Sequence, residues 1–197
     1  MNFIHRKGTR RLSGTDRARR ILAAVMLTLP LVSAADFSVV SGHTSIVTDA
    51  IVTEAQLDSA LSDAVVDAID KGIEIRIVAE LRLIRVRPRI WDEVIGEWRT
   101  GFRLKYHDLS STYVLVDERT GELEPFSTIR DAMDSLAELT ITLPVVTETL
   151  PQTRHGYRAS LRIDIDRDEL PPPLKLVTEI SPEWKLGSRW TEWAVAE

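Results

Sequence analysis

The sequence of 197 residues contains no cysteine, which removes two common stabilising and anchoring devices. Without cysteine there is neither a disulfide nor a residue for lipid attachment, so side-chain packing alone must stabilise the fold. A glycine-rich phosphate loop and a dinucleotide fingerprint are absent too, and no two histidines have the spacing of metal ligands. We therefore expect a protein without a metal or another cofactor.

Aromatic residues are also few, at 6% of the chain, and long apolar runs are scarce. The exception is the uncharged stretch over residues 21–35, which follows a segment with seven cations and one carboxylate. This order, with small residues at Val32-Ser33-Ala34, is typical of an export signal that is cleaved after Ala34 or Ala35. The stretch has about 15 residues, fewer than the roughly 20 of a spanning helix. We expect a periplasmic or secreted protein; the alternative is an inner-membrane anchor at residues 21–35.

Removal of the export signal changes the charge of the chain. Residues 1–34 hold seven of the 25 Lys and Arg residues and one of the 30 Asp and Glu residues, so 18 cations and 29 carboxylates remain, a formal net charge of −11. An acidic protein lacks the broad cationic surface that displaces counterions from nucleic acid. By its length, the segment 36–197 is expected to form one domain, and we expect it not to bind nucleic acid.

The longest pattern in this domain is an alternation over Ile73–Arg87. Every odd position from Ile73 to Leu83 is apolar, and every even position between them except Val78 is charged. A period of two over this length predicts a strand with one face on the core and the other in solvent. After Leu83 the apolar phase moves by one residue, which predicts a β-bulge.

The remaining segments predict a mixture of strands and two helices. Residues 37–52 predict two short strands around a turn at Ser41-Gly42, and Thr53–Ile69 predicts a helix that Lys71-Gly72 ends. The prolines of Leu170–Leu174 predict an extended crossing. Further predicted elements are strands over 98–109, 112–116, 140–148, 157–166 and 190–195, a turn over 117–122 and a helix over 127–139.

Clean alternation in several strands favours an antiparallel sheet with one solvated face. Amphipathic helices that are separated by runs of strands indicate an α+β fold. We therefore predict a curved antiparallel sheet or partial β-sandwich, with two amphipathic helices packed over one face or end.

Cations recur on the outward positions of the two longest predicted strands. Arginine forks bind phosphate or carboxylate through paired hydrogen bonds, so we predict a surface for an anionic lipid headgroup or an envelope protein. The alternative interpretation is a solvated face on which these cations pair with Glu74, Glu80 and Glu97. The predicted binding residues are Arg76, Arg82, Arg85, Arg87, Arg99, Arg103 and Lys105.

Three other groups of residues match the pattern of a known functional site only in part. The acidic run Asp164–Glu169 begins like a calcium loop but has glutamate where the turn requires glycine. His107 stands near Ser110 and Ser111, the residue types of a serine hydrolase, but no nucleophile-elbow motif surrounds either serine. The tryptophans at 184, 190 and 193 are expected to close the core or, alternatively, to form an exposed interface patch.

Two segments carry most of a family resemblance. They are the strand Phe102–Leu109 (FRLKYHDL) and the closing pattern of tryptophans at 184, 190 and 193. The pairs Trp91-Asp92 and Phe126-Ser127 and the proline run at 170–174 add to it. Together they resemble an uncharacterised family of exported bacterial proteins, a domain of unknown function numbered 4390. The resemblance brings no catalytic residues, and it implies an accessory role beside a membrane sensor kinase of the nitrogen-regulation type.

The leader, the missing catalytic motifs and the cationic strands lead to one functional expectation. We expect an exported, non-enzymatic binding or accessory domain of the cell envelope, associated with a membrane sensor kinase or with anionic lipid. An envelope hydrolase and a purely structural envelope protein are the alternatives.

Overall fold

The structure, a computed structural model, describes residues 36–47, 50–144, 150–151 and 156–196. The predicted export signal at residues 1–35 lies outside the described residues. The described elements are β1 (Phe37–Val47), β2 (Ala50–Ser59), α2 (Asp63–Asp70), β3 (Ile75–Arg85), β4 (Glu93–His107), β5 (Thr112–Asp117), β6 (Leu123–Phe126), α3 (Ile129–Ser135), β7 (Glu138–Pro144), β8 (Tyr157–Ile165), α4 (Pro172–Ile180) and β9 (Thr191–Ala196), with short 3-10 turns η2 (Arg167–Glu169) and η3 (Pro182–Trp184).

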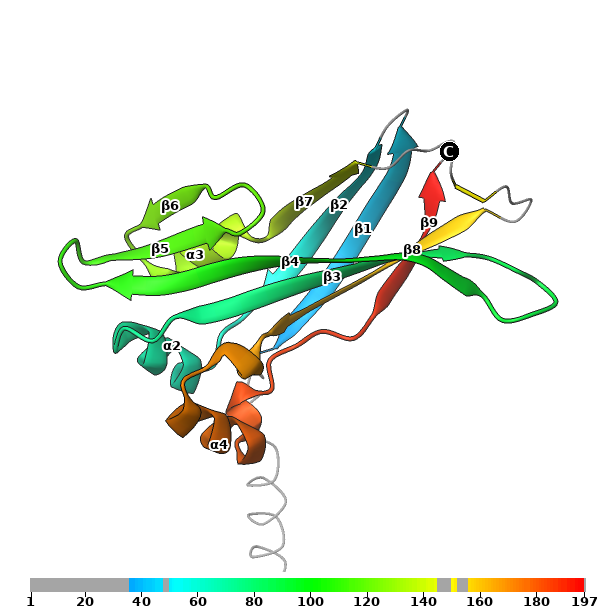
Figure 1. Ribbon diagram of the computed structural model, residues 1–197. Coiled ribbons are helices and arrows are strands. Elements are labelled where there is room, and N and C mark those ends of the chain that lie inside the picture. The colour runs from blue at the N-terminus through cyan, green and yellow to red at the C-terminus, as the bar shows by residue number, and fades with distance from the viewer. Residues whose placement is uncertain (1–35, 48–49, 145–149, 152–155, 197) are drawn as a thin grey trace, which may run out of the picture. The chain divides into compact units, whose positions relative to one another are not determined.

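The strands form one curved nine-stranded sheet in the order β6-β5-β4-β3-β8-β9-β1-β2-β7 (Figure 1). All neighbouring pairs are antiparallel except β1 and β9, which run parallel and are joined only at Thr44–Val195 and Ser45–Ala196. The predicted α+β class with a curved antiparallel sheet is confirmed.

The core lies on the inner face of this curved sheet. Inward residues of β3, β4 and β8 meet those of β1, β2 and β7 in one apolar cluster. Helix α2 contributes Val65 and Ile69, and α3 contributes Ala132 and Met133. Each helix therefore covers the inner face through one apolar stripe, as amphipathic periodicity predicts.

Strand β3 lies inside the sheet, between β4 and β8. Its odd residues from Ile75 to Leu83 are buried, as the alternation predicts. The predicted bulge is confirmed in position, because the register with β4 shifts between Leu83 and Ile84. The extra residue, however, lies on β4: Leu83 faces Gly96 and Ile84 faces Val94, so that Ile95 remains between them.

The prediction for residues 37–59 was wrong in two respects. Ser41 and Gly42 lie inside β1, where a register shift marks a bulge at Val40, and they make no turn. Thr53 lies in β2, fully buried, with its hydroxyl 2.9 Å from that of Thr44. Apolar residues at 51, 55 and 57 fit a strand of period two as well as a helix, and pairing with β1 and β7 favours the strand.

Helix α2 therefore begins ten residues later than predicted, after the N-cap Ser62. The hydroxyl of Ser62 accepts a hydrogen bond from the backbone N–H of Val65 at 3.3 Å, as capping serines do. The predicted end is confirmed: Lys71 is the C-cap and Gly72 has φ of 82°, a left-handed conformation that favours glycine.

Two later predictions are also corrected. The second helix is capped by Thr128 and ends at Ser135, so Leu139 belongs to strand β7. The proline run does not remain extended, because α4 begins at Pro172. Proline is tolerated in the first helical turn, where the backbone N–H groups have no acceptor within the helix. The final strand is confirmed as β9, and the short strand β6 was not predicted.

The three tail tryptophans take two different positions. Trp184 is buried in the core, and Trp193 packs partly buried against it. Trp193 also donates from its indole nitrogen to the hydroxyl of Thr44 at 2.9 Å. The expected closing of the core is thus seen at both residues, whereas Trp190 lies beside arginines of the outer face.

Candidate binding surface on the outer face of the sheet

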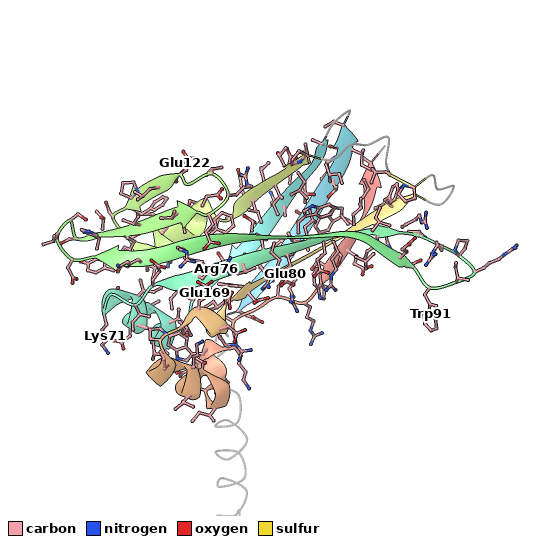
Figure 2. The ribbon with its side chains drawn as sticks, viewed as in Figure 1. Lys71, Arg76, Glu80, Trp91, Glu122 and Glu169 are labelled. Atoms are coloured by element: carbon pink, nitrogen blue, oxygen red, sulfur yellow. The ribbon has the colours of Figure 1, made fainter. Side chains whose placement is uncertain are left out.

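The outward residues of β3, β4 and β8 form a ladder of arginines and carboxylates, which we call the charged face (Figure 2). Alternation along each strand places them there, because every second side chain leaves the core. The charged face consists of Arg76, Glu80, Arg82, Glu97, Arg99, Arg103, Lys105, Arg158, Arg162 and Asp164.

Glu80 lies at the centre of the charged face with its side chain only 7% exposed. Its two carboxylate oxygens lie 2.9 Å from Nε of Arg99 on β4 and 2.6 Å from Nη2 of Arg162 on β8. Nε of Arg162 also lies 3.3 Å from the carboxylate of Asp164. Burial raises the pKa of Asp164, and the charge of Arg162 opposes this shift. The central carboxylate thus links three neighbouring strands.

Arg76 and Arg103 organise the end of the charged face near α4. Arg76 donates to Glu118 at 2.9 Å and to Asp166 at 2.8 Å, and Arg103 contacts Glu118 at 2.6 Å. The hydrogen bond from Arg76 holds the pKa of Glu118 below its ordinary value, against the effect of burial. Both guanidinium pKa values are raised, first by hydrogen bonds from Arg76 to Glu118 and from Arg103 to Glu74.

Two more carboxylates complete this end, because Arg103 also lies 2.8 Å from Glu74 and 3.0 Å from Glu169. The two arginines therefore face four carboxylates, and three of these, Glu74, Asp166 and Glu169, line a cavity of about 130 Å³ together with both arginines, Leu170 and Pro171. An anion entering this cavity would compete with carboxylates that already occupy the guanidinium groups. The electrostatics there disfavour a phosphate ligand.

Trp190 lies over the middle of the charged face. Its ring centroid is 4.0 Å from the guanidinium carbon of Arg82 and 4.9 Å from that of Arg162, a geometry typical of cation–π contact. Arg82 also donates to Glu97 at 3.1 Å. The ring and the carboxylates together hold these long side chains in place.

At the opposite end, the charged face continues into the hairpin between β3 and β4. Glu93 pairs with Arg85 and lies 3.7 Å from Arg87. Arg158 pairs with Asp92 and lies 3.3 Å from Glu192. The ion pairs at this end thus join three arginines to three carboxylates. At the end near α4, two arginines face four carboxylates.

The structure places five of the seven predicted residues on the outer face: Arg76, Arg82, Arg99, Arg103 and Lys105. Arg87 lies in the hairpin. Arg85 keeps the inward phase of Leu83, because the extra residue of the bulge lies on β4, and it is paired in register with Tyr157 of β8. Six of the seven are arginines, each in at least one ion pair, and their partners include Glu74, Glu80 and Glu97, the carboxylates of the alternative interpretation. Lys105 is exposed. Whether these cations bind an anion stays a prediction.

Sequence reasoning missed three residues of this surface: Arg158, Arg162 and Glu118. A signal existed for the two arginines, because they occupy outward positions of the predicted strand 157–166. No local signal could place Glu118, since it follows β5 and reaches Arg76 across β4.

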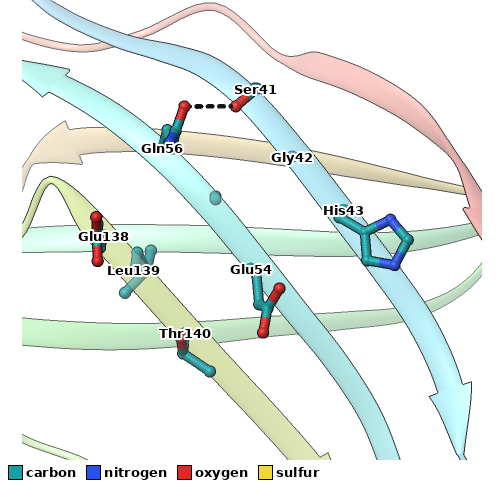
Figure 3. Close-up of a pocket in the computed structure, with 9 residues that line it drawn as sticks. Ser41, Gly42, His43, Glu54, Gln56, Glu138, Leu139 and Thr140 are labelled. Atoms are coloured by element: carbon teal, nitrogen blue, oxygen red, sulfur yellow. Dashed lines mark hydrogen bonds between the residues drawn. The ribbon is translucent and has the colours of Figure 1, made fainter.

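A larger cavity, of about 600 Å³, lies elsewhere, over β1, β2 and β7 (Figure 3). Its lining includes a hydroxyl, an imidazole and a carboxylate, from Ser41, His43 and Glu54. Ser41 donates to the side chain of Gln56 at 3.1 Å, on the side away from His43. Among the described residues His43 makes no hydrogen bond with Ser41 or Glu54, so these groups are not arranged as a nucleophile and its base.

His107 does meet Ser110, with 3.2 Å between its Nδ1 and the serine Oγ. His107 is the exposed last residue of β4 and Ser110 lies in the exposed turn before β5. Ser110 also contacts Thr112 at 2.7 Å. Within the part of the chain that the structure describes, no carboxylate orients His107 and no cluster of His, Asp and Glu has the geometry of a metal site. Three carboxylates of the acidic run Asp164–Glu169 pair with arginines: Asp164, Asp166 and Glu169.

Comparison with known proteins gives one match. A family model described as "Domain of unknown function (DUF4390)" matches residues 34–194, which confirms the resemblance that the sequence shows. No curated protein and no solved structure matches the chain. A bilayer-spanning helix is not found among the described residues, where no helix has the length and apolarity required.

Proposed function

We propose that this chain, which belongs to the DUF4390 family, is an exported, non-enzymatic binding domain of the cell envelope that docks a partner protein on its charged face. The observation that carries the proposal is the chain of mutual ion pairs around Glu80 and Arg76. These pairs hold arginine and carboxylate side chains in fixed positions on an exposed sheet. Because these side chains are already held in place, less side-chain conformational entropy is lost when a partner binds.

A protein suits this face better than an isolated phosphate. Charges of both signs alternate along it, and the forks of Arg76 and Arg103 already bind carboxylates. A face with alternating charges favours a protein surface with the opposite pattern of charges. It disfavours a surface on which all charges have the same sign. A membrane sensor kinase is the partner class that the family resemblance favours.

A pull-down from envelope extracts tests the proposal. The variant Arg99→Ser/Lys105→Ser removes two exposed cations of the charged face, and Lys71→Ser/Arg130→Ser removes two exposed cations elsewhere. We expect the first variant to lose a specific protein that the wild type and the second variant both recover. Recovery of the same proteins by all three, or of no specific protein, contradicts the proposal and favours a purely structural envelope protein.

The alternative function, an envelope hydrolase, rests on the contact between His107 and Ser110. A hydrolase screen of the wild type beside His107→Ala separates the two functions. Activity that disappears in His107→Ala supports the hydrolase, and equal inactivity of both proteins favours the binding domain.

A further inference from the structure

The hairpin between β3 and β4 ends in an exposed apolar tip. Trp91 is 90% exposed and Ile90 is 63% exposed, and Val94 beside them is half-exposed. Figure 2 shows the side chain of Trp91 pointing away from the sheet at the far end of this hairpin. Full exposure of a tryptophan next to an isoleucine is unfavourable in water and is typical of an interaction site.

Hydrogen bonds hold the backbone of this tip in one conformation. The carboxylate of Asp92 accepts from the backbone N–H of Arg87 at 2.9 Å, and Nε of Arg87 donates to the carbonyl of Trp91 at 3.0 Å. Asp92 also pairs with Arg158 of β8. These contacts hold the tip in one conformation relative to the sheet. Its backbone therefore needs no further ordering when the apolar side chains bind a partner.

The tip is also locally cationic on an acidic domain. Arginines outnumber carboxylates in and beside the hairpin, with Arg85, Arg87, Arg89 and Arg158 against Asp92, Glu93 and Glu192. Arg89 is exposed and makes no ion pair with any described residue. An anionic surface would therefore be attracted to this end of the domain, although the net charge of residues 35–197 is −11.

We propose that the β3–β4 hairpin tip is a membrane-contacting element that seats Trp91 and Ile90 in the interface of an anionic bilayer. Tryptophan prefers the boundary between headgroups and acyl chains, and arginine is attracted to anionic headgroups. A convex tip enters a deformable lipid surface without a preformed pocket, which a protein partner would have to supply. The inference rests on the proposed envelope function for its setting, and adds lipid contact at the hairpin tip, which adjoins the charged face at Arg158.

The test uses the exported protein as cells produce it, mixed with vesicles of phosphatidylcholine with or without phosphatidylglycerol. Vesicle sedimentation measures binding, and quenching of tryptophan fluorescence by brominated lipid measures insertion. Trp91→Ser and Arg89→Ser remove the apolar and cationic halves of the tip. Leu109→Ser is the matched control, because Leu109 is 95% exposed in the turn at the other end of β4.

We expect binding to vesicles that contain phosphatidylglycerol, with quenching that Trp91→Ser removes. Affinity should fall about tenfold in Trp91→Ser and about fivefold in Arg89→Ser, and should not change in Leu109→Ser. Absence of binding, or equal binding and quenching in wild type and Trp91→Ser, overturns the inference. Loss of binding in Arg99→Ser/Lys105→Ser alone would also overturn it, while leaving the proposed role of the charged face in place.

Discussion

The carboxylate of Glu80 on β3 lies 2.6 Å from the guanidinium of Arg162 on β8, in the middle of the outer face of the sheet. Arg99 approaches the same carboxylate from β4 at 2.9 Å. One buried carboxylate therefore joins three neighbouring strands, of which β8 is far from β3 and β4 in sequence.

Replacing Glu80 should destabilise the fold strongly. In Glu80→Ala the guanidinium groups of Arg99 and Arg162 lose a shared, buried partner, and we expect a loss of about 2–3 kcal/mol in the free energy of unfolding. Urea denaturation measures it. Glu97→Ala is the control, because its pair with Arg82 is largely exposed and should contribute less than about 1 kcal/mol. Equal losses in the two variants would contradict a special role for Glu80.

Gly42 is predicted to tolerate no side chain while Trp193 is present. A Cβ atom at Gly42 would lie 2.4 Å from the Trp193 ring, and the hydrogen bond from that ring to Thr44 keeps it in place. We expect Gly42→Ala to lower the free energy of unfolding by about 1–3 kcal/mol.

A double-mutant cycle tests this steric cause. In a Trp193→Ala background, Gly42→Ala should have almost no effect, because the obstructing ring is gone. The same loss in both backgrounds would show that the backbone of β1, and not the ring, requires glycine.

Glu118 should contribute to the acid sensitivity of the protein. Its pKa in the folded state is lowered from 4.5 because Arg76 donates to it. As the pH falls, the Glu118 carboxylate is therefore protonated at a higher pH in the unfolded chain than in the folded protein. The stabilisation is complete above the unfolded pKa of 4.5 and is lost as the pH falls through the folded pKa.

We expect Glu118→Gln to be less stable than the wild type at pH 7 by about 1–2 kcal/mol and to lose less stability between pH 5 and acid pH. Chemical denaturation at a series of pH values measures both effects. Glu122→Gln is the control, since Glu122 is exposed and makes no ion pair with a described residue. If the stability of Glu118→Gln fell with pH as steeply as that of the wild type, Glu118 would not contribute to the acid sensitivity.

The sequence predicts best where a single period dominates. Strands β3 and β8 and the part of β4 from Trp98 onward follow from clean alternation, and the turn at Gly121 follows from its residue types. The first five residues of β4, from Glu93, were predicted as a connection. Residues 53–59 were assigned to a helix and not to a strand because their apolar positions fit two periods, and only pairing with β1 and β7 favours the strand. Proline content likewise does not distinguish an extended crossing from a first helical turn, as Pro172 shows.

The candidate surface was partly predictable for the same reason. Alternation placed the arginines of β3 and β4 outward, but strand order decides which charges meet. That β8 lies beside β3 brings Arg162 to Glu80, and the position of η2 brings Asp166 to Arg76. These contacts span 82 and 90 residues of sequence, and no local pattern encodes such distances. The exposure of Trp91 likewise depends on how far the hairpin extends.

The most direct test of the binding function is photo-crosslinking in living cells from a reactive amino acid at position 105. This position is exposed within the charged face, and position 130 on α3 is an exposed control outside it. We predict that position 105 yields a specific protein adduct in the cell envelope and that position 130 does not. No adduct from position 105, or the same adducts from both positions, would contradict the account.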